Sequence, residues 1–493
     1  MQTSGPVVKP GVRRSVVVTT MTRYSILLLS LVSTMALARL LTPAEIGVFS
    51  MAAVFVNLAH SMRDFGVGQY IIQEKELTTE RVRTAFGITL AIAWAMAALL
   101  VISAPWLAEF YREPGVADVL LVLAINFALI PFGSVVLSYM NREMQFSTIF
   151  RVGITSEFLR SGSAIGLAWW GLGAMSLAWS AVVGVIATVI LARVVGPAQF
   201  VLRPGFREWR RILRFGGQAT LGTMAFELQR GAPDVIIGRT MTAAAVGFFG
   251  KALGVIQLFD RAVLSAVRPA VLPHMAAKHR AGAGLAGFYG HGLSLITALA
   301  WPFYAYLAAM ALPVVRILYG DQWDAAVPLA RILAIYGAVN VLFAFSGQAL
   351  VAVGSVRLMA RLRMVSLAAT VLALAVAVPY GLEAVAYAMV FPALVGLLYS
   401  YRLLRATLGL GLEPYVRATV ASVFLSGCTV ALPIIYQWAP GGAEHRIWQT
   451  FLIGTAGAAA GWLLGVFLLR HPILDELRLL FRQARNRMRP ASG

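Results

Sequence analysis

The sequence predicts an all-α, polytopic integral membrane protein of fourteen transmembrane helices, arranged as two pseudo-symmetric six-helix lobes with two appended C-terminal helices. Composition, the spacing of apolar stretches and an internal repeat lead to this fold class. Of 493 residues, 59% are hydrophobic and 13% are charged, whereas soluble domains carry about 25% charged residues. The mean hydropathy is +0.78. A chain this apolar needs a bilayer as solvent, which excludes a soluble enzyme, a fibrous protein and a disordered chain.

Fourteen apolar stretches come close to the ~20 residues that cross the hydrocarbon core of a bilayer. They cover residues 16–39, 46–72, 84–107, 116–140, 149–171, 174–195, 214–238, 245–272, 288–312, 328–351, 358–378, 382–403, 414–437 and 447–469. The connections between them are short, and many contain Gly or Pro. The first stretch is too long for a signal-peptide core, so we expect it to be a retained helix.

The basic residues predict the orientation of these spans. With the N-terminus in the cytoplasm, 26 of the 41 Lys and Arg residues fall in cytoplasmic segments and six in outer segments. Cytoplasmic loops of membrane proteins carry this excess, so both termini are expected in the cytoplasm. The net charge of +20 therefore reflects topology, and nucleic acid is not an expected partner.

The chain resembles itself at an offset of 200 residues. Segments 39–58 and 239–258 share seven identical positions, which include Arg39 with Arg239 and Gly47 with Gly247. Six spans per copy keep both copies in the same orientation, an arrangement that lets two transporter lobes rock around a central site. The predicted divisions are 1–195 for the N-lobe, 196–213 for a basic amphipathic linker, 214–403 for the C-lobe, 404–470 for spans 13 and 14, and 471–493 for a basic cytoplasmic tail.

Nine cations fall inside the predicted spans, where each costs roughly 2.5–3.5 kcal/mol even on lenient insertion scales. They are Arg23, Arg63, Arg151, Arg160, Arg230, Lys251, Arg261, Arg268 and Arg417. The anions at similar depth are Asp64, Glu157, Glu227, Asp234 and Asp260. Because cations outnumber anions, structural ion pairs do not account for the whole set.

Helical spacing gathers these charges on polar stripes. Asn57, His60, Arg63 and Asp64 lie within about 120° of one another around a helix, and the glycines that follow, Gly66 and Gly68, favour close packing or a bend. Arg261 and Arg268 share one face. We therefore expect a cleft between the lobes that is cationic on both walls, with Arg63, Arg230 and Arg261, near mid-span, as its main binding residues. Further binding candidates are Arg23, Arg160, Lys251 and Arg268, although cations near span ends can also reach the lipid headgroups. The expected ion-pairing or coupling groups are His60, Asp64, Glu157, Glu227, Asp234 and Asp260.

Arginine is suited to phosphate because its planar guanidinium stays charged and forms paired hydrogen bonds. A cationic cleft beside lipid tails indicates an amphiphile with a phosphate or pyrophosphate head. No set of Cys and His residues has the spacing of a metal site, and no cofactor or catalytic group is expected. The P-loop pattern is also missing from the sequence, so ATP is not the direct energy source.

Several segments resemble a known family. Residues 37–52 (LARLLTPAEIGVFSMA), 63–68 (RDFGVG), 141–147 (NREMQFS) and 171–178 (GLGAMSLA) are similar to bacterial polysaccharide-unit flippases of the Wzx type. These belong to the multidrug/oligosaccharidyl-lipid/polysaccharide exporter superfamily. The resemblance implies an inner-membrane protein that moves undecaprenyl-pyrophosphate-linked oligosaccharides to the periplasmic leaflet, for exopolysaccharide, capsule or O-antigen assembly. Membrane lipids, a polysaccharide polymerase and a chain-length regulator are the further partners it suggests.

Three other functions compete with this one. A lipid II flippase of peptidoglycan synthesis belongs to the same superfamily. A multidrug or cation antiporter fits poorly, because the predicted cavity is rich in arginine and poor in anions. A membrane glycosyl polymerase or ligase would need an extended outer loop with catalytic groups. The largest outer connection, 313–327, offers only Arg316, Asp321 and Asp324, so an enzyme is not expected.

Overall fold

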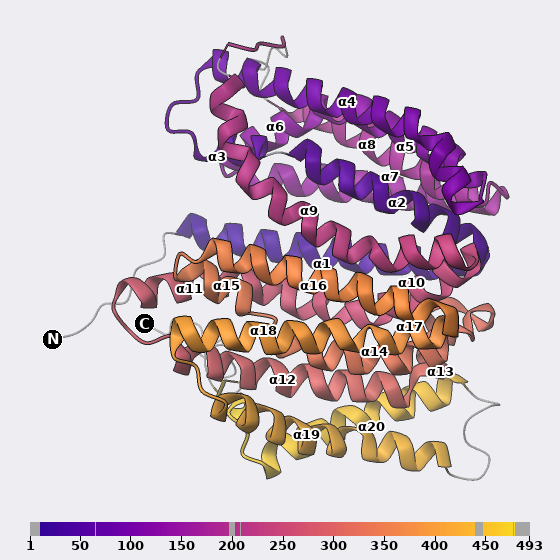
Figure 1. Cartoon of the computed structure of the whole chain (residues 1–493), viewed down its shortest axis with the longest axis vertical. Helices are drawn as coiled ribbons and strands as arrows, with labels where there is room; N and C mark the ends of the chain where they lie inside the picture. Colours follow the sequence, from indigo (N-terminus) through magenta and orange to yellow (C-terminus); the bar gives the residue numbers. More distant parts are fainter. Residues whose placement is uncertain are drawn as a thin grey trace, which may run out of the picture. The chain divides into compact units, whose positions relative to one another are not determined.

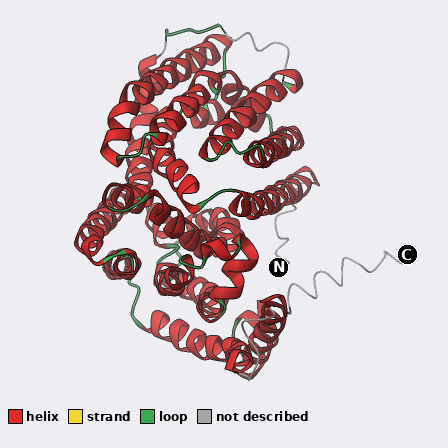
Figure 2. Ribbon diagram, turned by 90° about the vertical axis from the view of Figure 1, so that its right-hand side faces the viewer, coloured by secondary structure: helices red, strands yellow, loops and turns green. Residues whose placement is uncertain are grey.

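The structure is a computed structural model that describes residues 10–64, 66–196, 203–207, 209–438, 447–476 and 478. Side chains of residues 10–20, 22, 64 and 211–222 lie outside this description, as do parts of the predicted linker (197–202 and 208) and most of the predicted tail (477 and 479–493). Every regular element in the described part is a helix (Figure 2). The chain divides into two compact units, residues 1–250 and 251–493, which are treated separately below.

In the described part of unit 1 the structure has nine helices, and a tenth begins there. Figure 1 shows where they lie. They are α1 (Pro10–Leu40), α2 (Pro43–Asp64), α3 (Val67–Gln73), α4 (Thr79–Tyr111), α5 (Gly115–Leu129), α6 (Pro131–Arg142), α7 (Phe146–Trp169), α8 (Ala174–Val195), α9 (Trp209–Thr240) and α10 (Ala243–Phe259). The helix α7 packs along both α1 and α8, and α9 packs along α2. Thus α9, which follows the predicted linker in sequence, is part of the packing of unit 1.

Unit 2 contains the rest of the helices, in the same chain order. They are η1 (Asp260–Leu264), α11 (Ser265–Arg280), α12 (Ala286–Ala309), α13 (Ala311–Tyr319), η2 (Asp321–Trp323), α14 (Ala326–Val341), α15 (Ser346–Ala352), α16 (Val356–Ala377), η3 (Val378–Tyr380), α17 (Leu382–Ala388), α18 (Val390–Leu408), α19 (Glu413–Trp438) and α20 (Ile447–Leu468). The helix α12 packs along α19, which in turn packs along α20. The element η1 is a π-helical turn that joins α10 to α11.

The chain is an all-helical, multi-pass membrane protein. Among the described residues, eleven helical segments are long and apolar enough to cross a membrane, and the bent pair α5–α6 makes a twelfth if it counts as one span. The pair bends by 51° at Pro131, whose ring removes one helical hydrogen bond and crowds the carbonyl of the preceding turn. The helices α7 and α9 cover the two other predicted stretches with 24 and 32 residues. The charged residues within them explain why they are less apolar than the rest.

The turns α1–α2 and α9–α10 have the same bounds at an offset of 200 residues. In the first, Thr42 and Glu45 form a capping box: the Thr42 N–H donates to Glu45 Oε2 at 2.7 Å, and the Glu45 N–H donates to Thr42 Oγ1 at 3.3 Å. In the second turn, Ala245 stands in place of the glutamate, so the hydrogen bond to a carboxylate is missing. The other hydrogen bond of the capping box remains, because the Ala245 N–H donates to Thr242 Oγ1 at 3.2 Å. The repeat in sequence is therefore also a repeat in local structure.

Two glycines of the repeat lie at a close backbone contact inside unit 1. A Cβ atom on Gly47 of α2 would lie 1.7 Å from the carbonyl oxygen of Ala243. A Cβ atom on Gly247 of α10 would lie 2.1 Å from the carbonyl oxygen of Pro43. Pro43 and Ala243 are themselves counterparts at the offset of 200, so the contact is reciprocal. Glycine at both positions lets the first turns of α2 and α10 touch backbone to backbone.

Candidate functional site

Unit 1 contains a pocket of about 630 Å³, a size typical of sites for small molecules. Helices α2, α3, α4, α6 and α9 all contribute side chains to it. The polar residues that line it are Asn57, His60, Ser61, Arg63, Gln69, Thr89, Ser134, Ser138, Thr223, Glu227 and Arg230. Four of the residues nominated from sequence, His60, Arg63, Glu227 and Arg230, therefore lie around a single pocket.

The charged side of the pocket is formed by α2 and α9. Arg63 is buried, with 7% of its surface exposed, whereas Arg230 is exposed and Glu227 is half-buried. His60 stacks on Phe127 with ring centroids 4.4 Å apart, which fixes the plane of the imidazole. Two guanidinium groups face one described carboxylate, so this side of the pocket is positive. At 1.5 Å per residue, Arg63 lies about 30 Å along the 31-residue pass α2–α3, closer to the α3 end than the mid-span position expected.

A break in the second pass shapes the α3 side of the pocket. Gly66 has φ of 68°, a left-handed conformation that favours glycine, and it separates α2 from α3. This is the bend expected from the glycines after Arg63. The next glycine, Gly68, lies against α6, where an added Cβ would meet Ser138 Oγ at 3.1 Å. The break thus brings α3 onto α6 and closes that side of the pocket.

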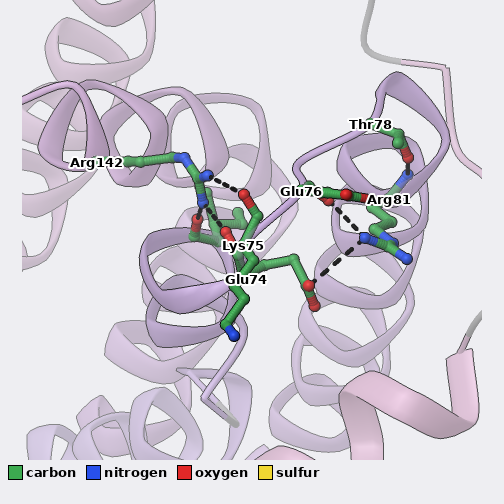
Figure 3. A network of polar contacts seen from close by, with 7 residues as sticks. Glu74, Lys75, Glu76, Thr78, Arg81 and Arg142 are labelled. Carbon is green, nitrogen blue, oxygen red and sulfur yellow. Dashed lines mark hydrogen bonds and ion pairs between the residues drawn. The ribbon is translucent and has the colours of Figure 1, made fainter.

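The end of α3 is held in place by a network of arginine contacts (Figure 3). Arg142, at the end of α6, donates from Nη1 to the carbonyl oxygens of Ile71 at 2.8 Å and of Glu74, and from Nη2 to that of Lys75 at 3.3 Å. From the other side, Arg81 of α4 donates to the Glu76 carbonyl at 2.6 Å. One guanidinium therefore satisfies the carbonyls that a helix end leaves without intrahelical partners.

The second side of the pocket is neutral, and sequence reasoning missed most of it. Thr89 comes from α4, Ser134 and Ser138 from α6, and Gln69 from α3. The serines are four residues apart, so they share one face of α6. That spacing in an apolar span is a signal in the sequence, but neutral hydroxyls stand out less there than charged groups do.

Other nominated residues of unit 1 lie outside the residues that line this pocket. Arg160 forms an ion pair with Glu157, donating from Nε to Glu157 Oε2 at 2.9 Å, and its side chain packs on Gly184 of α8. Arg23 lies on α1, and Asp234 lies one turn beyond Arg230 on α9. The side chain of Asp64 is outside the described part of the chain.

The nominated residues of unit 2 gather around the π-helical turn. Arg268 Nη2 lies 2.8 Å from Asp260 Oδ1, and Arg261 Nη2 lies 3.3 Å from Gln257 Oε1. The Lys251 ammonium lies 4.9 Å from the ring centroid of Tyr319 and also faces the ring of Trp323. π-Helical turns often occur at functional positions, and this one carries two of the nominated charges.

The chemistry of the pocket in unit 1 is that of binding. It combines guanidinium donors with neutral hydroxyls and amides, a set that suits an anionic ligand with a hydroxyl-rich part. In the part of the chain that the structure describes, no three His, Cys, Asp or Glu side chains are grouped so as to hold a metal ion.

Comparisons with known proteins agree on the type of protein. The profile of a family described as "Polysaccharide biosynthesis protein" matches residues 36–328. The chain is 24% identical over 477 residues to the teichuronic acid biosynthesis protein TuaB of Bacillus subtilis (strain 168), which covers 95% of this chain and 97% of that protein. It is 27% identical over 311 residues to the succinoglycan biosynthesis transport protein ExoT of Rhizobium meliloti (strain 1021), which covers 62% of each chain.

Among solved structures, the fold is similar to that of the lipid II flippase MurJ in an inward closed conformation. The TM-score is 0.69, and the match covers 92% of this chain and 99% of that one. The sequence identity is only 12%, so this likeness concerns the fold alone.

Proposed function

Because the chain belongs to the family of polysaccharide biosynthesis proteins and is a multi-pass transporter rather than an enzyme, we propose that it is a flippase for undecaprenyl-pyrophosphate-linked oligosaccharides. In this proposal it carries the repeat unit of an exopolysaccharide, capsule or O-antigen from the cytoplasmic to the periplasmic leaflet by alternating access. The observation that carries the proposal is the positive pocket in unit 1, where Arg63 and Arg230 line the same cavity as neutral hydroxyls and amides.

Arg63 and Arg230 would bind the pyrophosphate. Their guanidinium groups can form paired hydrogen bonds with phosphate oxygens, and Arg63 is buried, where such bonds are stronger than in water. The lipid tail needs no protein pocket, because it can remain in the surrounding bilayer. Cationic cargo fits poorly, because the two arginines repel it and only Glu227 would attract it.

The proposal also includes fourteen spans, two six-helix lobes and cytoplasmic termini. The helices α7 and α9 supply the two spans that fall short in apolarity, and both are long enough to cross about 30 Å of hydrocarbon. With this orientation, the pocket is lined by α3 and α6, which form the cytoplasmic ends of the second and fourth spans. A lipid-linked unit made on the cytoplasmic side would then reach Arg63 first.

The test replaces the two pocket arginines, one at a time, with Ala or Lys. Losing a paired charged contact should weaken binding by about ten- to a hundredfold, so the Ala variants should accumulate lipid-linked intermediate and lose surface polymer. Lys keeps the charge without the planar fork and should rescue only partly. The readouts are surface polymer, the lipid-linked intermediate and membrane abundance. Arg261→Ala tests the third nominated arginine in the same assay.

The matched control is Arg151→Ala, which removes an exposed cation of α7 that does not line the pocket. It should leave export unchanged. The proposal would be overturned if the Arg63→Ala and Arg230→Ala variants, present at normal abundance, export as much polymer as the wild type. The same conclusion follows if Lys and Ala behave alike at both positions, since neither charge nor geometry would then matter there.

A lipid II flippase is the second candidate, because the fold is similar to that of MurJ. The two cargoes share a polyprenyl pyrophosphate, so the arginine variants do not separate them. Depletion of the protein does: a lipid II flippase would cause accumulation of lipid II and cell lysis, whereas the proposed function predicts viable cells that lack a polysaccharide.

A further inference from the structure

Two hydroxyls on the neutral side of the pocket in unit 1 can offer a ligand acceptors but not donors. The hydroxyl of Thr89 donates to the Ala85 carbonyl at 2.8 Å, and the hydroxyl of Ser138 donates to the Ser134 carbonyl at 2.9 Å. A hydroxyl has one proton and two lone pairs. With the proton engaged in its own helix, each of these groups presents only lone pairs to a ligand.

We propose that Thr89 and Ser138 form a subsite for the sugar next to the pyrophosphate, and that they recognise its hydrogen-bond-donating groups. This inference rests on the proposed function and concerns the neutral residues of the same pocket. Sugar hydroxyls and acetamido N–H groups are donors that suit lone pairs on this wall. The amides of Asn57 on α2 and Gln69 on α3 also line the pocket and can both donate and accept.

The two sides of the pocket therefore favour different parts of the cargo, one the pyrophosphate and the other the sugar. An ionised pyrophosphate diester carries acceptors only, so it cannot hydrogen-bond to a hydroxyl whose proton is already engaged. Arg63 and Arg230 carry donors only, so they attract the pyrophosphate more strongly than a neutral sugar. Phosphate on the α2–α9 side and sugar on the α4–α6 side is the orientation in which both sets of groups are satisfied.

Helix α4 also provides a matched residue for comparison with Thr89. Thr84 lies five residues before Thr89 on α4, is fully buried, and donates its hydroxyl proton to the Glu80 carbonyl at 3.0 Å. It has the same local hydrogen bond as Thr89 but does not line the pocket. A Thr→Val change removes the hydroxyl and keeps the shape, so the two positions differ in access to the ligand.

The experiment measures binding to the purified full-length protein in lipid nanodiscs. The probes are undecaprenyl pyrophosphate, the same lipid carrying one glucose, and the glucosyl lipid with its sugar hydroxyls methylated. Wild-type protein should bind the glucosyl lipid more tightly than the other two, because methylation removes the donors and keeps the oxygens. Thr89→Val and Ser138→Ala should each lower affinity for the glucosyl lipid about two- to tenfold and leave undecaprenyl pyrophosphate unchanged.

The controls separate this inference from the proposed function. Thr84→Val should change neither affinity, and Arg63→Ala should weaken both lipids. If the wild type binds undecaprenyl pyrophosphate no better than undecaprenol, the proposed function and the inference both fail. If it binds the lipids with and without glucose equally, or binds the methylated sugar as well as the free one, the inference alone is overturned. Equal losses for both lipids in Thr89→Val and Ser138→Ala would overturn it as well.

Discussion

Replacing Gly47 by alanine tests the backbone contact between the first turns of α2 and α10. The new Cβ would lie 1.7 Å from the Ala243 carbonyl oxygen, and ordinary contacts begin at 3.4 Å. The obstacle is backbone, which cannot rotate away as a side chain can. The two helix starts must therefore separate by about 1.7 Å, which forfeits most of the dispersion energy of the contact.

The size of the effect follows from two opposed terms. Overpacking of this kind costs about 1–3 kcal/mol, while alanine is favoured over glycine in a helix by about 1 kcal/mol. At Gly47 the overpacking term should win. At Gly247 the required shift is about 1.3 Å, because the added Cβ lies 2.1 Å from the Pro43 oxygen, so a smaller loss is expected. Gly250→Ala is the matched control, since nothing lies within 4 Å of its added Cβ.

The assay is the apparent melting midpoint of the purified protein in detergent. A unit of this size shifts by roughly 2–4 °C per kcal/mol, so Gly47→Ala should melt several degrees below the wild type and Gly250→Ala at or above it. The double variant Gly47→Ala with Gly247→Ala should lose less than the sum, because one shift makes room for both methyl groups. The reasoning is refuted if Gly47→Ala has the same melting midpoint as Gly250→Ala. It is also refuted if the double variant loses the full sum of the two single-variant decreases in melting midpoint.

Three further outcomes are expected. Arg142→Gln should speed amide hydrogen exchange in α3 and leave α7 unchanged, because a neutral amide cannot bind three carbonyls at once; equal exchange in wild type and variant would contradict this. Burial lowers the pKa of His471, whose Nδ1 accepts from the Ile473 N–H at 3.2 Å, so its folded form is neutral. That stability is present above the unfolded pKa of about 6.5 and is lost as the pH falls towards the lower folded value. The segment after α20 should therefore be less protected from amide exchange at pH 5.5 than at 7.5, when each rate is divided by the intrinsic rate at that pH; equal protection at the two pH values would speak against it. Reporters fused after Arg112 and Arg280 should report periplasm and cytoplasm, and reversal at both sites would defeat the topology.

The sequence was most informative about where helices lie. Each of the fourteen predicted stretches is covered by one helix, by a closely spaced pair or, at 245–272, by α10, η1 and α11 in succession, because apolar length is what a bilayer requires. It was less informative about the breaks inside them. The bend at Pro131 and the π-helical turn at Asp260–Leu264 change one or two hydrogen bonds without altering apolarity. Only Gly66, next to a polar stripe, was noticed in advance.

Some residues of the candidate site could be predicted from the sequence and others could not. Arg63 and Arg230 could be nominated because a charge inside a span is expensive and needs a reason. Arg160 satisfied the same criterion, yet its charge is matched by Glu157 one turn away. The hydroxyl of Thr89 could not be distinguished from that of Thr84, since both donate to their own helix, and only the packing decides which one faces the pocket.

The membership of α9 in unit 1 has a consequence for how the protein is made. The walls of the pocket from α2, α3, α4 and α6 are complete when Arg142 has been synthesised, but the last wall arrives with Arg230. Those residues are separated by roughly 90 positions, or about 5–20 s of translation. During that interval Arg63 belongs to a half-built pocket that faces the lipid or the insertion machinery. A ribosome that stops before α9 would leave helices α1 to α8 in the membrane without the residues of α9 that complete the binding site.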